Sequence, residues 1–253
     1  MSTWILLRGL MRETRHWGAF APMLQAALPD SRVIAIDLPG NGSQHQLISP
    51  LAVGEMVAFC RHYLTQQQLT GPFSLLALSL GGMVASEWAQ SFPDEITRCV
   101  LINTSMRPFS PFYRRLRPRN YPSLLYHGLR RSQPQQFEQL ILRLTSSRAD
   151  PQVLPDWQAW QQQYPVSRSN ALRQLLAAAQ FRAPRQRPVA KMLVLAGSKD
   201  QLVDYRCSLA LAQHWQTALA VHPWAGHDLP LDNSDWVVQQ IVNWLGQNIS
   251  QPV

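Results

Sequence analysis

The sequence contains few cysteines and few charges, and both shortages narrow the class of protein. Three cysteines occur among 253 residues, and charged residues make up 15% of the chain. Cys60, Cys99 and Cys207 are widely spaced and odd in number, which fits neither a disulfide framework nor a set of metal ligands. We therefore expect three reduced, mostly buried thiols.

Signatures of cofactor binding are also missing. No glycine-rich loop of the Walker type occurs, so no nucleotide cofactor is expected. Beyond the neighbours His227 and Asp228, no histidine and carboxylate have the spacing of metal ligands, so no metal site is expected either. The sequence thus predicts a protein without a cofactor.

Long apolar runs are absent as well. None reaches the roughly 18 residues that a membrane-spanning helix needs. Residues 1–8 contain four consecutive apolar residues and no basic leader, which disfavours a secretory signal, although a chain whose leader had been removed would look the same. Hydrophobic residues make up 46% of the sequence, a composition typical of globular proteins. We expect a cytoplasmic protein with one large core.

The net charge of +8 is concentrated in the middle of the chain. Residues 106–190 contain 14 arginines and no lysine against three acidic residues, a net charge of +11. The rest of the chain carries 9 basic and 12 acidic residues, a net charge of −3. This asymmetry indicates that the middle is a separate structural unit.

Short apolar runs alternate with helical patterns in the two outer thirds, which is typical of a parallel sheet covered by helices on both faces. We expect six strands, at residues 4–7, 33–37, 73–78, 99–102, 192–196 and 219–222. Helices are expected at residues 20–28, 55–69, 80–92, 205–214 and 234–249. Residues 105–188 show helical patches at 135–144 and 170–181 and no convincing strand. The predicted fold is a mostly parallel, doubly wound α/β sheet, with a core at 1–104 and 189–253 and an inserted helical lid at 105–188.

A serine lies at the junction between a predicted strand and a predicted helix. An apolar run leads directly into Ser79, and small residues stand two positions away on each side, Ala77 and Gly81. A nucleophilic serine on such a sharp turn needs these small neighbours, although the usual motif has glycine where this chain has Ala77. The alternative is a serine that caps the amino terminus of a helix.

A carboxylate and a histidine follow later strands of the predicted sheet. Asp200 comes just after the fifth strand, at the sheet edge where catalytic groups gather, and Asp204 is its alternative. His227 lies in the loop after the last strand, and His222, within that strand, is its alternative. The order serine, aspartate, histidine is the one expected for hydrolases of this architecture. Ser79, Asp200 and His227 are the predicted triad.

These motifs resemble the α/β-hydrolase superfamily over nearly the whole chain. Residues 37–43 (DLPGNGS) are similar to a loop common in the superfamily, and residues 79–82, 197–200 and 226–227 match its nucleophile, acid and base motifs. Within the superfamily the chain looks closest to small lid-carrying esterases, such as the pimeloyl-acyl-carrier-protein methyl ester esterases. The menaquinone-pathway synthases, which use the same triad for an elimination, are also near.

The resemblance implies hydrolysis of a carboxylic ester or thioester through an acyl-enzyme on Ser79. It also implies an oxyanion hole made by the backbone N–H groups of Leu10 and Leu80. The family usually has His-Gly where this chain has Arg8 and Gly9. Arg8 either pairs with a nearby carboxylate, the favoured interpretation, or faces an anionic substrate, alone or with Arg12.

The arginine-rich lid suggests a partner. Its arginines cluster at Arg114, Arg115, Arg117, Arg119, Arg130 and Arg131. The related esterases dock an acidic carrier protein on lid arginines, so the resemblance implies an acidic acyl-carrier partner or an anionic substrate tail. A solvated basic surface is the plainer interpretation. We expect no nucleic acid, because the lid aromatics more simply cover an acyl pocket.

Two other functions stay open from the sequence. One is a triad-dependent lyase of the menaquinone-pathway type, in which Ser79 acts as a base. The other is a catalytically silent binding protein, suggested by Arg8 and Ala77 where the family has histidine and glycine. The intact triad argues against the second, because a scaffold has no physical need for three catalytic groups in register.

Overall fold

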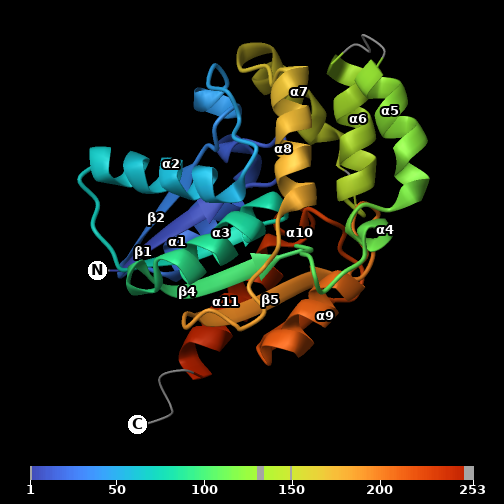
Figure 1. Cartoon of the computed structure of the whole chain (residues 1–253). Coiled ribbons are helices and arrows are strands. Elements are labelled where there is room, and N and C mark those ends of the chain that lie inside the picture. Colours follow the sequence, from blue (N-terminus) through green and yellow to red (C-terminus); the bar gives the residue numbers. More distant parts are fainter. Residues whose placement is uncertain (1, 130–133, 149, 248–253) are drawn as a thin grey trace.

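The computed structural model describes residues 2–129, 134–148 and 150–247 of the chain (Figure 1). Six parallel strands form one sheet in the order β2-β1-β3-β4-β5-β6. The strands are β1 (Ser2–Leu7), β2 (Ser31–Ile36), β3 (Phe73–Leu78), β4 (Ile96–Ile102), β5 (Lys191–Gly197) and β6 (Ala218–His222). The expected sheet of six strands is confirmed. β1 and β2 begin two residues earlier than expected and β4 begins three residues earlier, because the first residues of these strands still pair with neighbouring strands.

Successive side chains of each strand enter two different cores, as the two-residue period of a strand requires. Ile5 and Leu7 of β1 pack with helices α2 (Val53–Gln66), α3 (Leu80–Ser91) and α9 (Arg206–Trp215). Trp4 and Leu6 pack with α1 (Phe20–Ala27) and α11 (Ser234–Gln247) on the opposite face. The sheet is therefore covered on both faces, which explains its continuous apolar strands and confirms the doubly wound α/β fold.

The segment between β4 and β5 is helical in its described part. It contains α4 (Phe112–Arg115), α5 (Tyr121–Leu129), α6 (Pro134–Thr145), α7 (Leu154–Gln163) and α8 (Arg168–Gln180), with short turns η4 (Pro118–Asn120) and η5 (Pro151–Val153). Figure 1 shows α5 to α8 grouped together outside the sheet. The segment enters and leaves at one place, because Arg107 and Arg182 form a parallel bridge and Ala183 N donates to Arg107 O at 2.7 Å.

The helical segment packs on the loops that follow the strands. Met11 N, after β1, donates to Gln174 Oε1 of α8 at 2.9 Å. Arg117 N donates to Leu202 O, after β5, at 3.0 Å, and Asp228 N, after β6, donates to Thr145 O of α6 at 2.7 Å. The helices thus lie over the carboxyl edge of the sheet, where ligands bind in open parallel sheets.

Three of the remaining short elements lie in loops that follow strands: η1 (Thr14–Trp17), η2 (Gly42–Gln44) and α10 (Leu229–Asp232). The fourth, η3 (Pro93–Glu95), directly precedes β4. The three cysteines are free and buried, as expected. Burial raises the pKa of the Cys60 thiol to about 12, so that thiol stays protonated at neutral pH.

Candidate active site

Ser79 occupies a sharp turn between β3 and α3. Its backbone lies in an unusual conformation, with φ 56° and ψ −115°, which a residue other than glycine adopts only under local constraint. A Cβ added at Gly81 would lie 2.4 Å from Leu7 O, so the first turn of α3 packs directly on the β1 backbone. Ser79 stands at the helix N-cap, but its side chain makes no capping hydrogen bond. This geometry leaves the hydroxyl available and disfavours the capping alternative.

The residues that follow β4 hold this turn in place. Ser79 N donates to Ile102 O at 2.9 Å, and Thr104 Oγ1 donates to Ser79 O at 2.8 Å. A Cβ added at Gly82 would lie 2.8 Å from the Thr104 Cβ atom, so the close packing of α3 on this loop needs a glycine there. The strained serine is therefore supported from both neighbouring strands, β1 and β4.

Asp200 and His227 form a buried pair. His227 Nδ1 lies 2.6 Å from Asp200 Oδ2, and the two residues are 4% and 1% exposed. Asp200 Oδ1 accepts from the N–H groups of Leu202 at 2.8 Å and Val203 at 2.9 Å. A carboxylate only accepts, so His227 Nδ1 carries the proton in this bond, and whenever the ring is neutral its Nε2 keeps a lone pair. This is the tautomer that a histidine base needs.

The two rivals of this pair have structural roles. Asp204 Oδ1 accepts from Arg206 N at 3.0 Å and so opens helix α9. His222 Nδ1 accepts from Ala225 N at 3.1 Å, and the rings of Trp224 and Trp236 stand at 89° to its ring. Burial lowers the pKa of His222, and its Nε2 lies 3.2 Å from Asn233 Nδ2.

Asn103 is a further residue of the site that the sequence analysis missed. Its Nδ2 donates to Gly226 O at 3.0 Å and to His227 O at 2.7 Å, and its Oδ1 accepts from Gly197 N at 2.9 Å. It is 1% exposed and has a φ of 46°, which asparagine tolerates better than most residues. The one available signal was an asparagine directly after a buried strand, at the catalytic edge of the sheet.

The backbone near Ser79 contains the two N–H groups proposed for an oxyanion hole. A Cβ added at Gly9 would lie 3.1 Å from Ser79 Cβ, so the loop after β1 runs against the serine. Met11 N and Arg12 N are engaged, by Gln174 Oε1 at 2.9 Å and Gly9 O at 3.2 Å. Within the described part of the chain, the N–H groups of Leu10 and Leu80 have no such acceptor.

Arg8 pairs with a carboxylate. Its NH1 and NH2 groups donate to Asp228 Oδ1 at 3.1 Å and Oδ2 at 2.5 Å, and its guanidinium lies 4.8 Å from the centre of the Trp17 ring. Both charged side chains are almost fully buried. Of the two interpretations of Arg8, the structure supports the ion pair.

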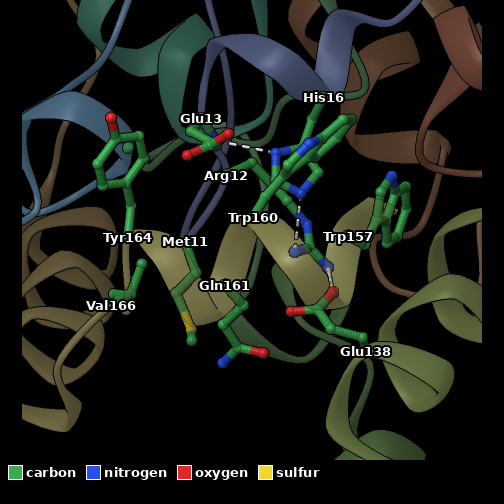
Figure 2. A pocket seen from close by; sticks show the side chains of 11 residues that line it. Met11, Arg12, Glu13, His16, Glu138, Trp157, Trp160, Gln161, Tyr164 and Val166 are labelled. Carbon is green, nitrogen blue, oxygen red and sulfur yellow. Dashed lines mark hydrogen bonds and ion pairs between the residues drawn. The ribbon is translucent and has the colours of Figure 1, made fainter. Parts of the chain in front are cut away.

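Arg12 is also held by the protein. Its NH2 lies 2.8 Å from Glu138 Oε2 of α6, and its guanidinium lies 4.6 Å from the Trp157 ring of α7. Figure 2 shows Arg12 between His16 and Glu138, beside a cavity of about 20 Å³. This volume holds about one water molecule, and neither Ser79 nor His227 lines it. Arg12 thus joins the loop after β1 to the helical segment.

The arginines of the helical segment between β4 and β5 differ in their surroundings. Arg115 NH2 and NH1 donate to the carbonyls of Ala178 at 2.5 Å and Ala179 at 3.4 Å, at the carboxyl end of α8, where a cation is favoured. Arg119 is exposed and donates to Gln201 Oε1. Arg114 is half-buried, and its carbonyl accepts from Asp204 N at 2.8 Å. Arg130 and Arg131 lie outside the described residues.

The described residues contain no group of three or more histidine, cysteine, aspartate or glutamate side chains that could hold a metal ion. Their helices include none with the length and hydropathy of a membrane span.

Curated proteins match parts of this chain. The pimeloyl-[acyl-carrier protein] methyl ester esterase of Chromobacterium violaceum is 32% identical over 94 residues, which cover 36% of this chain and 34% of that protein. The biotin biosynthesis bifunctional protein BioHC of Teredinibacter turnerae is 34% identical over 107 residues, 41% of this chain and 17% of that protein. The matched part thus spans only about a third or less of these curated relatives.

Solved structures and a family model match nearly the whole chain. A thermophilic esterase from Thermogutta terrifontis has a TM-score of 0.75 at 22% identity, covering 98% of this chain and 90% of that one. The family model described as alpha/beta hydrolase fold matches residues 5–234. The chain therefore belongs to the α/β-hydrolase fold family.

Proposed function

We propose that this protein is a serine hydrolase that cleaves a carboxylic ester or thioester through an acyl-enzyme on Ser79. The observation that carries the proposal is the buried pair of His227 Nδ1 and Asp200 Oδ2, 2.6 Å apart, on the sheet edge that also presents Ser79 in its strained turn. The partial matches to named methyl ester esterases support the same class of substrate.

The proposed reaction uses the triad in two half-cycles. Ser79 Oγ attacks the acyl carbonyl while His227 Nε2 takes the hydroxyl proton, and Asp200 stabilises the resulting imidazolium. The N–H groups of Leu10 and Leu80 stabilise the oxyanion of the tetrahedral intermediate. His227 then gives its proton to the departing alcohol or thiol. Water attacks the acyl-enzyme with His227 again as the base, and the acid and free Ser79 are released.

We further propose that residues 105–188 form a lid over this site, between two parts of one core at 1–104 and 189–253. Three hydrogen bonds support this division: Thr145 O and Gln174 Oε1 accept from the loops that carry His227 and Leu10, and Arg117 N donates to the loop that carries Asp200. In this arrangement the lid helices shape the acyl pocket and exclude water from the acyl-enzyme.

An acidic acyl-carrier protein is the partner that we propose for the lid. The names of the matched esterases include such a carrier, and the net charge of +11 over residues 106–190 complements an acidic surface. Titration with an acyl-carrier protein at low salt tests this step. We expect binding that weakens with added salt and with the charge reversal Arg114→Glu, whereas no binding at low salt would contradict it.

Turnover of p-nitrophenyl esters of rising chain length tests the hydrolase itself. The wild type is expected to hydrolyse them with an optimum that reports the length of the acyl pocket, and Ser79→Ala is expected to abolish turnover. Ser74→Ala is the matched control. Ser74 is a buried serine of β3, the strand that leads into Ser79, and its hydroxyl has no hydrogen-bond partner among the described residues. A Ser79→Ala protein that retains full turnover would overturn the proposal.

A further inference from the structure

A buried ion pair connects two loops of the active site that are far apart in sequence. Arg8 follows β1, and Asp228 follows β6, 220 residues later. The NH1 and NH2 groups of Arg8 each donate to one carboxylate oxygen of Asp228. The exposed fractions of the two side chains are 3% and 4%. Two parallel bonds of this kind fix the relative orientation of the groups as well as their distance.

Each partner is the immediate neighbour of a group in the proposed mechanism. Arg8 precedes Gly9, whose backbone runs against Ser79, and Leu10, a proposed oxyanion donor. Asp228 directly follows His227, the proposed base. A rigid link between Arg8 and Asp228 therefore sets the distance between the base and the oxyanion donor.

Other contacts hold each end of the link. The ring of Trp17 covers the Arg8 guanidinium at 4.8 Å. Asp228 donates its N–H to Thr145 O at 2.7 Å and accepts at its carbonyl from Asp232 N at 3.0 Å. Asp232 Oδ2 in turn accepts from Gly226 N at 2.5 Å. The residues on both sides of His227 are thus fixed by bonds to other elements.

The charges around His227 show what the pair does electrostatically. The carboxylates near its loop are Asp200 after β5, Asp228 beside it and Asp232 of α10. The guanidinium of Arg8, from the loop after β1, neutralises Asp228. Asp232 is bound by Ser146 Oγ and by the N–H groups of Gly226 and Ser147. Asp200 is then left as the carboxylate that contacts the ring.

We propose that Arg8 and Asp228 are a positioning pair for the catalytic centre, which fixes the His227 loop against the loop of the oxyanion donor. The inference rests on the proposed hydrolase function and deepens it. A buried ion pair can be replaced by uncharged side chains without loss of stability, so stability alone does not explain the pair. Such a replacement removes the two-point contact that holds the two loops in a fixed position relative to each other.

A double-mutant cycle with Arg8→Met and Asp228→Asn separates positioning from stability. Each single variant leaves one buried charge unpaired and is expected to lower Tm and kcat together. The double variant has no unpaired charge, so we expect its Tm to return toward that of the wild type. Its kcat for a p-nitrophenyl ester should stay about 10- to 100-fold low, with KM within about threefold, because only the reacting geometry is lost.

Two further variants sharpen the cycle. Arg8→Lys retains the positive charge but loses the two-point contact with Asp228. Compared with Arg8→Met, we expect its Tm to be closer to the wild-type value than its kcat is. The double variant Arg61→Met/Glu95→Gln removes a different ion pair, which joins α2 to η3 at the other edge of the sheet, and should leave kcat unchanged.

The outcomes distinguish the two proposals. A double variant whose kcat recovers together with its Tm shows a purely structural pair and overturns the positioning role alone. A wild type that neither turns over esters nor reacts with a fluorophosphonate at Ser79 overturns the hydrolase function, and the positioning role with it. Low kcat at restored Tm, in a protein that labels at Ser79, supports both.

Discussion

Asn103 donates a hydrogen bond to the main-chain carbonyl of His227 at 2.7 Å, from the residue that directly follows β4. The same side chain also binds Gly226 O at 3.0 Å and Gly197 N at 2.9 Å. One buried amide therefore joins the loop of the histidine to the strand that leads to Asp200. The bond places the proposed base against the middle of the sheet, where Ser79 also lies.

The variant Asn103→Asp tests this link. Aspartate keeps the acceptor for Gly197 N but loses both donors, so two buried carbonyls lose their partner and face a negative charge. We expect a loss of about 1–3 kcal/mol in the free energy of unfolding and a lower kcat. Denaturant unfolding and ester turnover measure the two effects. Asn243→Asp, at an exposed position of α11, is the control and should change neither.

A side chain added at Gly81 is expected to disturb the turn at Ser79. Because a Cβ at this position would lie 2.4 Å from Leu7 O, Gly81→Ala must push α3 away from β1. We expect a destabilisation of about 1–3 kcal/mol and the loss of Ser79 reactivity. Gly54→Ala, in α2, meets its first neighbour, Glu87 Oε1, at 3.9 Å and should be neutral or slightly stabilising. Equal behaviour of the two variants would contradict the close packing.

Asparagine substitutions at Asp200 and Asp204 are expected to have very different effects on kcat. Asp200→Asn retains an acceptor for Leu202 N and Val203 N, but its amide donates toward His227 and reverses the tautomer of the ring. The expected loss in kcat is about 10⁴-fold with the fold intact. Asp204→Asn should change kcat by less than about threefold, because Asp204 binds the start of α9. Circular dichroism measures the fold of both variants, and ester turnover measures their activity. A larger loss of kcat in Asp204→Asn than in Asp200→Asn would make Asp204 the carboxylate of the triad.

The buried His16 predicts a pH dependence of stability. Its pKa lies well below the ordinary 6.5 because the ring is buried and faces Arg12 and Arg8. As the pH falls through 6.5, the unfolded chain takes up a proton that the folded protein refuses, so stability falls on acidification. The slope from this residue is at most about 1.4 kcal/mol per pH unit.

Unfolding titrations between about pH 7 and 5 measure this slope against variants. The free energy of unfolding of His16→Gln should change less with pH than that of the wild type, by the contribution of His16. The pH dependence of His62→Gln, a change at an exposed position, should equal that of the wild type. A His16→Gln protein with an unchanged slope would show that other groups carry the acid sensitivity.

Local sequence patterns predicted the sheet, and they also selected the residues of the proposed triad, because both depend on short-range signals. Continuous apolar runs indicated six strands, and Ser79, Asp200 and His227 each follow one of them. Helices α4, α5 and α7 were not predicted. In α7 (Leu154–Gln163), glutamines and two tryptophans give no clear apolar stripe, and its tryptophans instead pack on His16 and on arginines of the β1 loop.

The supporting residues of the site were harder to predict because their partners are distant in sequence. Asn103 acts on loops more than 90 residues away, and Arg8 finds Asp228 at a separation of 220 residues. No periodicity or spacing contains this information, which appears only when strands β1, β3, β4, β5 and β6 lie side by side. The sequence suggested a carboxylate for Arg8 but not which one.

Fluorophosphonate labelling followed by intact mass measurement tests whether Ser79 is an activated nucleophile. We expect one phosphonyl adduct on the wild type, mapped to Ser79, none on Ser79→Ala, and much slower labelling of Asp200→Asn. Labelling of the Ser74→Ala control should equal that of the wild type. A wild type that stays unlabelled, or carries its adduct on another residue, would show that Ser79 is not the nucleophile.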